Sequence, residues 1–333
     1  MKQLSTDAPW SGGYVRDALG VDLASDHSRS VLPVTALVGL ALRRNPKRAH
    51  LLVSRVLAKH VPTEPGIATS AGHLLGLLVH RELQVPADAA TGPDAGAGSL
   101  TAVIDEAAGR LARLLEGDTP TDGRTAPDEA GRRRRLADVA GLGELLARWQ
   151  TELPGVVTIG YAETATGLGQ LVAGQLGTYY IHSTRQSSGG VEPYGAFEEM
   201  HSHATSHQLL PTSRAALDLA ETVVLVDDEL STGATIINTI RELHGTAPHR
   251  HYVVASLVDL RSTADRDRLE ELAREIGARI TAVALAQGSI QLPETLALDA
   301  AELISNIPLP RSAVPRPGRI QLLDLRGIVP PIR

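Results

Sequence analysis

The sequence has no cysteine among its 333 residues, and aromatic residues make up only 3% of it. The lack of cysteine excludes disulfides, thiolate nucleophiles and cysteine-based zinc sites. A buried core must therefore be built mainly from Leu, Val, Ile and Ala. No run of eighteen apolar residues predicts a membrane span, and the first residues hold no apolar signal-peptide core. These absences predict a cytoplasmic protein without a membrane partner.

The chain also lacks an excess of positive charge. Its 38 acidic residues outnumber its 32 basic ones, which gives a formal net charge of −6. Such a balance argues against broad nucleic-acid binding. The only dense basic block is Arg132–Arg135, and a solvated helix start explains it better than a nucleic-acid contact.

The first 150 residues predict a mainly helical region. Apolar residues stand at helical spacing in five segments, which are 37–43, 49–57, 71–83, 100–115 and 136–153. Two stretches rich in polar and helix-breaking residues, 85–98 and 117–131, predict flexible surface segments. No internal repeat is found.

From residue 155 the pattern changes to alternating strands and helices. Strands are predicted at 156–161, 178–182, 223–226, 251–260 and 279–285, and helices at 167–176, 215–219, 236–243 and 265–276. This alternation predicts an α/β fold with a parallel sheet and helices on both faces. We assign residues 151–290 to this core and residues 291–333 to a C-terminal extension or hood.

The strongest local signal is the strand Val223–Val226, which runs into Asp227 and Asp228. A turn rich in hydroxyls follows, formed by Ser231, Thr232, Gly233, Ala234 and Thr235, and a helix begins behind it. The start of a helix presents backbone N–H groups and the positive end of the helix dipole, so it favours an anion. Glycine lets the backbone approach a phosphate closely.

Two carboxylates beside a phosphate site need a partner of their own, and sugar hydroxyls can donate hydrogen bonds to them. A site with both features suits a ribose 5-phosphate. The lysine of a P-loop and the G-x-G-x-x-G dinucleotide fingerprint are both missing here. A second loop rich in small residues, Gly160–Gly169, follows an earlier strand. Because ligands bind at the carboxyl ends of parallel strands, both loops are expected at one edge. The glycines of the second loop also fit close helix–sheet packing.

The segment from Val223 to Thr235 resembles the motif of type I phosphoribosyltransferases that binds phosphoribosyl pyrophosphate (PRPP). Glu229 departs from the motif, because many members carry an apolar residue there. The chain also resembles a narrower group, the phosphoribosyltransferases encoded beside bacterial tellurite-resistance and stress genes. Three features carry that likeness: Asp-Asp-Glu, the Gly160–Gly169 segment and Asn45–Arg48.

The resemblance implies a Rossmann-like parallel sheet of this family, PRPP as substrate, a base-like acceptor, Mg²⁺ as cofactor and a homodimer. It implies that Asp227 and Asp228 hold the ribose hydroxyls and the metal, and that residues 231–235 hold the 5-phosphate. It assigns pyrophosphate to Glu163, Thr164, Ala165, Thr166 and Gly167, with Arg185 beside them. Asp259 and Arg261 are expected near the acceptor.

The long polar stretch 187–208 matches the position of the family's flexible catalytic loop, and His203 is its candidate catalytic residue. His201, His203 and His207 also have a spacing that could hold a transition metal. Lys59 and the neighbouring His60 could cap the site or form a solvated helix face. Two alternatives stay open: a PRPP-sensing regulator without turnover, and a metal-dependent hydrolase that uses the histidines. The acceptor and the direction of reaction cannot be read from the sequence.

Overall fold

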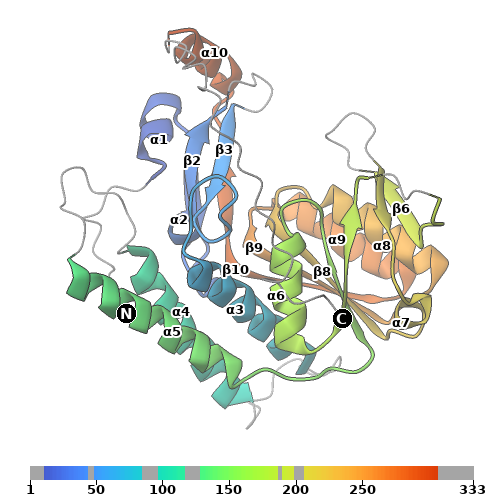
Figure 1. Ribbon diagram of the computed structural model, residues 1–333. Helices are drawn as coiled ribbons and strands as arrows, with labels where there is room; N and C mark the ends of the chain where they lie inside the picture. Colours follow the sequence, from blue (N-terminus) through green and yellow to red (C-terminus); the bar gives the residue numbers. More distant parts are fainter. Residues whose placement is uncertain are drawn as a thin grey trace, which may run out of the picture.

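The computed structural model describes residues 11–43, 49–84, 97–116, 128–186, 190–198 and 206–306. Eight strands form one sheet in the order β1-β10-β9-β8-β4-β5-β7-β6 (Figure 1). Its five central strands are parallel: β10 (Arg279–Gln291), β9 (His251–Asp259), β8 (Thr222–Leu230), β4 (Val156–Gly160) and β5 (Tyr179–Thr184). The predicted parallel core is confirmed, and each predicted strand has its counterpart.

Antiparallel strands extend the sheet at both edges. On one side β1 (Asp22–Ser25) pairs with the far end of β10, and on the other β7 (Ser206–Leu209) and β6 (Gly195–Glu198) follow β5. β8 is longer than predicted, because the strand continues through the acidic residues to Leu230.

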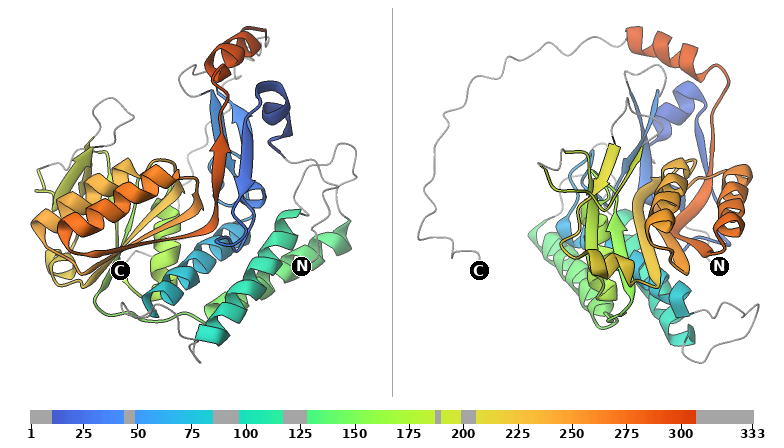
Figure 2. Two further views of the ribbon diagram at one scale, coloured as in Figure 1. Left: turned by 180° about the vertical axis from the view of Figure 1, so that it is seen from behind. Right: turned by 90° about the vertical axis from the view of Figure 1, so that its right-hand side faces the viewer.

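Helices cover both faces of the sheet (Figure 2). α6 (Thr166–Leu176) and α3 (Pro65–Gln84) pack on one face, and α8 (Ala234–Thr246) and α9 (Thr263–Ile276) on the other. Side chains alternate between the faces of a strand, so two cores form. Val224 and Val226 of β8 join the core with α3 and α6, while Val223 and Leu225 join the core with α8. The short helix α7 (Arg214–Asp218) precedes β8.

α4 (Ala97–Glu116) and α5 (Glu129–Ala147) pack on the side of α3 that faces away from the sheet. α5 begins where Asp128 accepts a hydrogen bond from the amide of Gly131 at 2.7 Å, and it passes without a break through Gly141 and Gly143. It therefore starts inside the stretch 117–131 that was predicted to be flexible. Residues 85–96 and 117–127 lie outside the described part of the chain.

The prediction of two helices at residues 37–43 and 49–57 is wrong. These residues form the antiparallel hairpin β2 (Val38–Leu42) and β3 (His50–Ser54), in which Leu40 pairs with Leu52. Short apolar runs fit either structure by periodicity alone, and pairing with a partner strand decides between them.

Three further helices lie around the hairpin and β1. α1 (Gly13–Leu19) precedes β1, α2 (Val34–Leu37) precedes β2, and α10 (Leu296–Asn306) follows β10 (Figure 1). None of the described helices is long and apolar enough to cross a membrane.

Candidate active site

A pocket of about 500 Å³ opens at the carboxyl ends of β4 and β8. Its lining comes from four parts of the chain that are far apart in sequence. The lining residues are Arg43, Leu51, Lys59, Tyr161 to Thr164, Arg185, His207, and all of Asp227 to Ile236. We call this space the strand-end pocket. Its volume is in the range of small-molecule sites.

The start of α8 forms one wall of the strand-end pocket. Gly233 precedes the helix with φ +75°, a left-handed conformation that favours glycine. Gly233 itself supplies no side-chain cap, and the amide of Ala234 donates to Oγ1 of Thr232 at 3.4 Å. The first N–H groups of a helix have no acceptor within the helix. The hydroxyls of Ser231, Thr232 and Thr235 lie on the same wall. The arrangement supplies several donors to one anion.

Asp227 and Asp228 lie on the strand rather than in a loop after it. Because side chains alternate along β8, the two carboxylates point to opposite faces of the sheet while both line the pocket. Oδ1 of Asp227 accepts a hydrogen bond from the amide of Asp228 at 2.8 Å. Burial, and next the charge of Asp228, raise the pKa of Asp227 well above its ordinary value.

Both oxygens of Asp228 have partners from other elements. Nζ of Lys59 lies 2.8 Å from Oδ2, and the hydroxyl of Thr164 donates to Oδ1 at 2.9 Å. Asp228 is 9% exposed, and the side chain of Lys59 is 27% exposed. These two contacts compensate the carboxylate for the hydration that burial removes.

The loop between β4 and α6 reaches the pocket only in part. Glu163 and Thr164 line it, whereas Ala165, Thr166 and Gly167 lie at the start of α6 behind the lining. The peptide bond between Ala162 and Glu163 is cis.

Two glycines flank this loop. A Cβ on Gly160 would lie 2.9 Å from the carbonyl oxygen of Ala165, and one on Gly169 would lie 2.8 Å from Cα of Gly160. Both distances are shorter than real Cβ contacts allow, so these glycines let α6 pack closely on β4. That packing fixes the loop at the edge of the sheet.

A chain of hydrogen bonds leads from this loop to Arg185. Oγ of Ser183 accepts from the amide of Ala162 at 2.9 Å and lies 3.0 Å from Nδ1 of His207. Nε of Arg185 donates to Nε2 of His207 at 2.9 Å. Since Nε2 accepts, the network assigns a neutral imidazole with its proton on Nδ1. His207 is 2% exposed and stacks on Phe197, with ring centroids 5.1 Å apart.

Asp259 and Arg261 do not line the strand-end pocket. They form a buried ion pair in which Nε and Nη2 of Arg261 donate to the two carboxylate oxygens at 3.0 and 2.9 Å. Nη1 of Arg266 lies 3.0 Å from Oδ2 of Asp259. The pair lies directly behind the α8 wall, because a Cβ on Gly233 would be 3.3 Å from Cδ of Arg261.

Sequence reasoning named Lys59 as a possible cap of the site but missed Arg43 and Leu51. All three line the pocket, the latter two from the hairpin that was predicted to be helical. A basic residue at the end of an apolar run was the only signal for Arg43. His203, His201 and the segment 45–48 lie outside the described residues.

Within the described residues, few side chains are placed to bind a metal ion. These residues include no cluster of three or more His, Asp or Glu side chains that could bind a metal ion. The carboxylates of Asp227 and Asp228 are hard oxygen donors of the kind that Mg²⁺ prefers. Both ring nitrogens of His207 already take part in hydrogen bonds, so this histidine is not set up as a metal ligand.

Comparison with known proteins gives one family match. A family model described as phosphoribosyl transferase matches residues 37–289, which is more than half of the chain. No curated protein shows a significant match.

Solved structures of adenine phosphoribosyltransferases also show local similarity. The enzyme from Trypanosoma brucei, in complex with AMP, pyrophosphate and ribose-5-phosphate, is 13% identical, with a TM-score of 0.29 over 45% of this chain and 68% of that one. The Giardia lamblia enzyme with 9-deazaadenine is 19% identical, with a TM-score of 0.29 over 50% and 90%. The Leishmania donovani enzyme is 14% identical, with a TM-score of 0.32 over 49% and 72%.

Proposed function

The chain belongs to the phosphoribosyl transferase family whose model spans residues 37–289, and on this premise we propose that it uses PRPP. In the proposed reaction the phosphoribosyl group passes to a base-like acceptor and pyrophosphate is released, or the reverse. One observation carries the proposal: the α8 start and the carboxylates of Asp227 and Asp228 share one pocket of about 500 Å³. Amide donors suit a phosphate, and carboxylates suit a sugar diol.

In the proposed complex the 5-phosphate binds the first turn of α8 together with the hydroxyls of Ser231, Thr232 and Thr235. The ribose hydroxyls donate to Asp227 and Asp228. Pyrophosphate lies between the loop that holds Glu163 and Thr164 and the guanidinium of Arg185. The supporting observation is that all of these residues line the strand-end pocket.

The chemistry is a substitution at C1 of the ribose. A lone pair of the acceptor forms the new bond to C1, and pyrophosphate leaves with the electron pair of the broken C–O bond. The transition state then resembles an oxocarbenium ion, as in glycoside hydrolysis. The protein contributes mainly by positioning both partners and by placing fixed dipoles around the developing charges.

Mg²⁺ fits the oxygen-rich donor set of the pocket. Asp227 and Asp228 would hold it together with oxygens of the substrate, and when bound it would neutralise charge on the leaving pyrophosphate. Backbone amides, Arg43, Lys59 and Arg185 supply the remaining positive potential, which is needed because Glu163 and Glu229 also line the pocket.

Asp259 and Arg261 stay predicted acceptor residues. Because the pair lies behind the α8 wall, we propose that it also supports the backbone at Gly233. A location in the cytoplasm and a homodimer are also proposed, and sedimentation analysis of the purified protein tests the second.

The test is a screen of bases and nucleotides with PRPP and Mg²⁺ that follows release of pyrophosphate. Asp228→Asn should lower turnover by about 10²-fold or more, as loss of one preorganised polar contact does in other enzymes. Asp267→Asn, which neutralises an exposed acid on α9, is the matched control. Unchanged kinetics in Asp228→Asn would remove the assignment. PRPP binding without turnover of any acceptor would instead support a sensor.

A further inference from the structure

A second cavity, of about 580 Å³, lies between α4 and α5 and shares no residue with the strand-end pocket. Four arginines and a single acid line it. Its lining consists of Arg110, Arg113, Leu114, Gly131, Arg134, Arg135, Ala137, Asp138 and Gly141. We call it the arginine cavity. Such a concentration of positive charge is unexpected in a chain with a net charge of −6.

Two of the four guanidinium groups are anchored by neighbours at the margin of the cavity. Nη2 of Arg110 lies 2.6 Å from Oε1 of Glu106, and Nε of Arg135 lies 3.1 Å from Oε2 of Glu64. Neither glutamate lines the cavity. Nη1 of Arg110 also donates to the carbonyl oxygen of Gly141 at 3.4 Å, which holds this side chain across the gap between the helices.

The other two arginines, Arg113 and Arg134, have no ion pair with any residue in the described part of the chain. Arg113 lies three residues after Arg110, so both side chains occupy one face of α4. Arg134 projects from α5. Asp138 supplies the only negative charge in the lining, so the cavity keeps a positive surplus.

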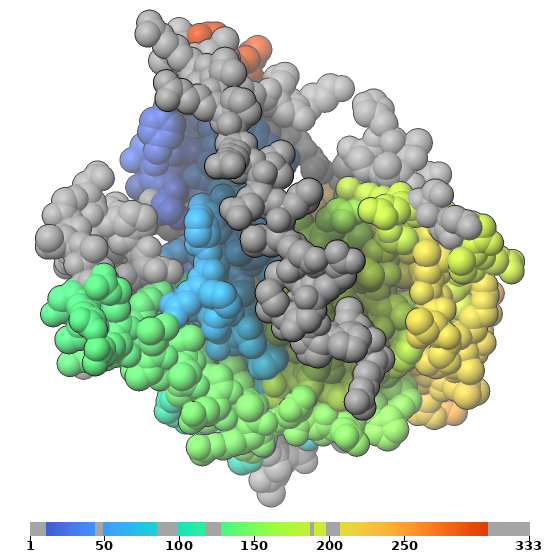
Figure 3. Space-filling model, in the orientation of Figure 1, coloured from blue at the N-terminus to red at the C-terminus, as the bar shows by residue number. Residues whose placement is uncertain are grey.

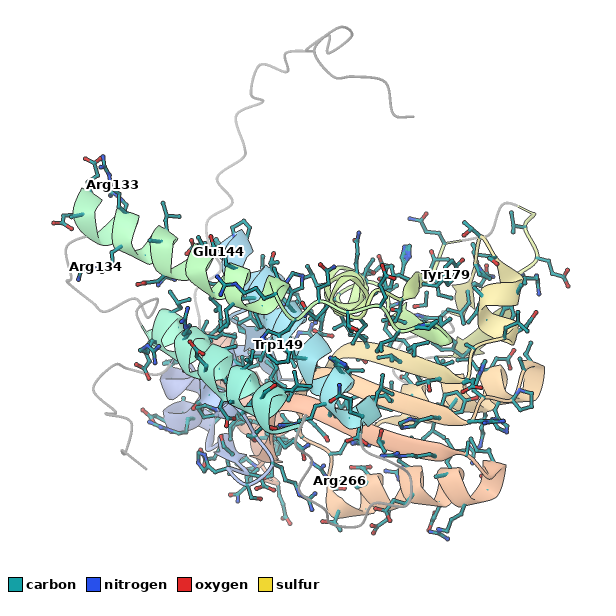
Figure 4. The ribbon with its side chains drawn as sticks, turned by 90° about the horizontal axis from the view of Figure 1, so that it is seen from below. Arg133, Arg134, Glu144, Trp149, Tyr179 and Arg266 are labelled. Atoms are coloured by element: carbon teal, nitrogen blue, oxygen red, sulfur yellow. The ribbon has the colours of Figure 1, made fainter. Side chains whose placement is uncertain are left out.

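The arginines of the outer surface are a different group. Arg132 and Arg133 do not line the cavity, and Arg133 pairs with Glu129 on the surface of α5. Figure 4 shows Arg133 and Arg134 pointing away from each other, with Arg134 on the side of α5 where α4 lies. α5 forms the lower left margin of the molecule in Figure 3. Within the basic block Arg132–Arg135, Arg134 and Arg135 therefore line the arginine cavity, whereas Arg132 and Arg133 do not.

We propose that the arginine cavity binds a compact polyanion that carries two or more phosphoryl groups. Guanidinium groups bind phosphate oxygens through paired N–H donors, and four of them converge here from two helices. The lining has no aromatic ring on which a base could stack, so the ligand is recognised through its phosphates. A nucleic-acid strand would instead follow the outer arginines and meet the net negative charge of the chain.

Calorimetric titration with inorganic tripolyphosphate, at about 0.15 M salt to screen diffuse attraction, tests the proposal. Two double variants are compared with the wild type: Arg113→Gln with Arg134→Gln, and Arg132→Gln with Arg133→Gln. Each removes two positive charges from exposed helix positions, and neither touches the strand-end pocket. Thermal melting checks that both fold.

The cavity variant should lose about tenfold or more in affinity, because two charge-assisted contacts are removed. The surface variant should stay within about twofold of the wild type. Any binding at the strand-end pocket is common to all three proteins and cancels in this comparison. Equal weakening in both variants, no weakening in the cavity variant, or no binding by the wild type would each overturn the proposal. If the wild type bound an RNA oligonucleotide more tightly than tripolyphosphate, the proposal would be overturned, because the ligand would then be a polymer.

Discussion

Nζ of Lys59 lies 2.8 Å from Oδ2 of Asp228, although 169 positions separate the two residues in the chain. The contact joins the segment after the β2–β3 hairpin to the edge of the parallel sheet and completes the strand-end pocket. Asp228 is buried, so the ammonium compensates a carboxylate that has lost much of its hydration. If a ribose diol binds Asp228 as proposed, we expect it to release Lys59, which can then face a phosphate.

Replacing Lys59 by methionine keeps the aliphatic part of the side chain and removes its charge. We expect KM for PRPP to rise by about tenfold, since one charge-assisted contact to the substrate is lost. Lys59→Arg should recover part of the affinity. Steady-state kinetics with varied PRPP measure both. Tighter PRPP binding in Lys59→Met would show instead that the ion pair holds the site closed.

His207 is expected to position Arg185, because its Nε2 accepts the Nε–H of the guanidinium at 2.9 Å. His207→Phe keeps a ring for stacking on Phe197 but removes the acceptor. KM for PRPP should rise by about tenfold, while kcat changes little. Phe197→Leu is the control, since it weakens the stacking and leaves the acceptor. If only Phe197→Leu raised KM, the ring packing rather than the hydrogen bond would be the cause.

The buried pair of Asp259 and Arg261 should stabilise the fold and brace the wall at Gly233. Arg261→Lys keeps the charge but loses the paired donors, and it should lower the free energy of unfolding by about 2 kcal/mol. KM for PRPP should rise as the wall loosens. Arg266→Lys, at a more exposed position, should cost less. A change in KM for the acceptor alone would show that Arg261 contacts that substrate.

His251 should make the fold sensitive to acid. Burial, and next the charge of Arg279, lower the pKa of His251 to about 4 from its ordinary value of 6.5. The unfolded chain therefore takes up a proton near pH 6.5, while the folded chain resists it until pH 4. Stability is fully present above pH 6.5 and falls as the pH drops from 6.5 towards 4.

Thermal melting between pH 7.5 and pH 5 measures this effect. His251→Gln should lose less stability over that range than the wild type, because glutamine takes up no proton. His27→Gln replaces an exposed histidine and should keep the wild-type pH dependence. An unchanged pH dependence in His251→Gln would assign the acid sensitivity to other groups.

Much of the sheet could be predicted from the sequence because its signals are local. Val223–Val226 is a short apolar run that ends in Asp227 and Asp228, and the glycine-containing turn follows at once. Strand, turn and helix start are consecutive there, so the wall at the start of α8 is encoded in neighbouring residues. The hairpin at 38–54 was missed because its strands are stabilised by each other, and a short apolar run alone fits a helix equally well.

The sequence by itself determined the order of the parallel strands and of the helices between them, the turn before α8, and the presence of two adjacent acids at the edge of the sheet. Only the tertiary structure decided that these acids point to opposite faces, that Lys59 pairs with one of them, and that His207 accepts a hydrogen bond from Arg185. The physical reason is how far apart in the chain the interacting residues lie. Backbone conformation follows from neighbouring residues, whereas the charge balance of a pocket depends on which distant segments the packed layers bring together.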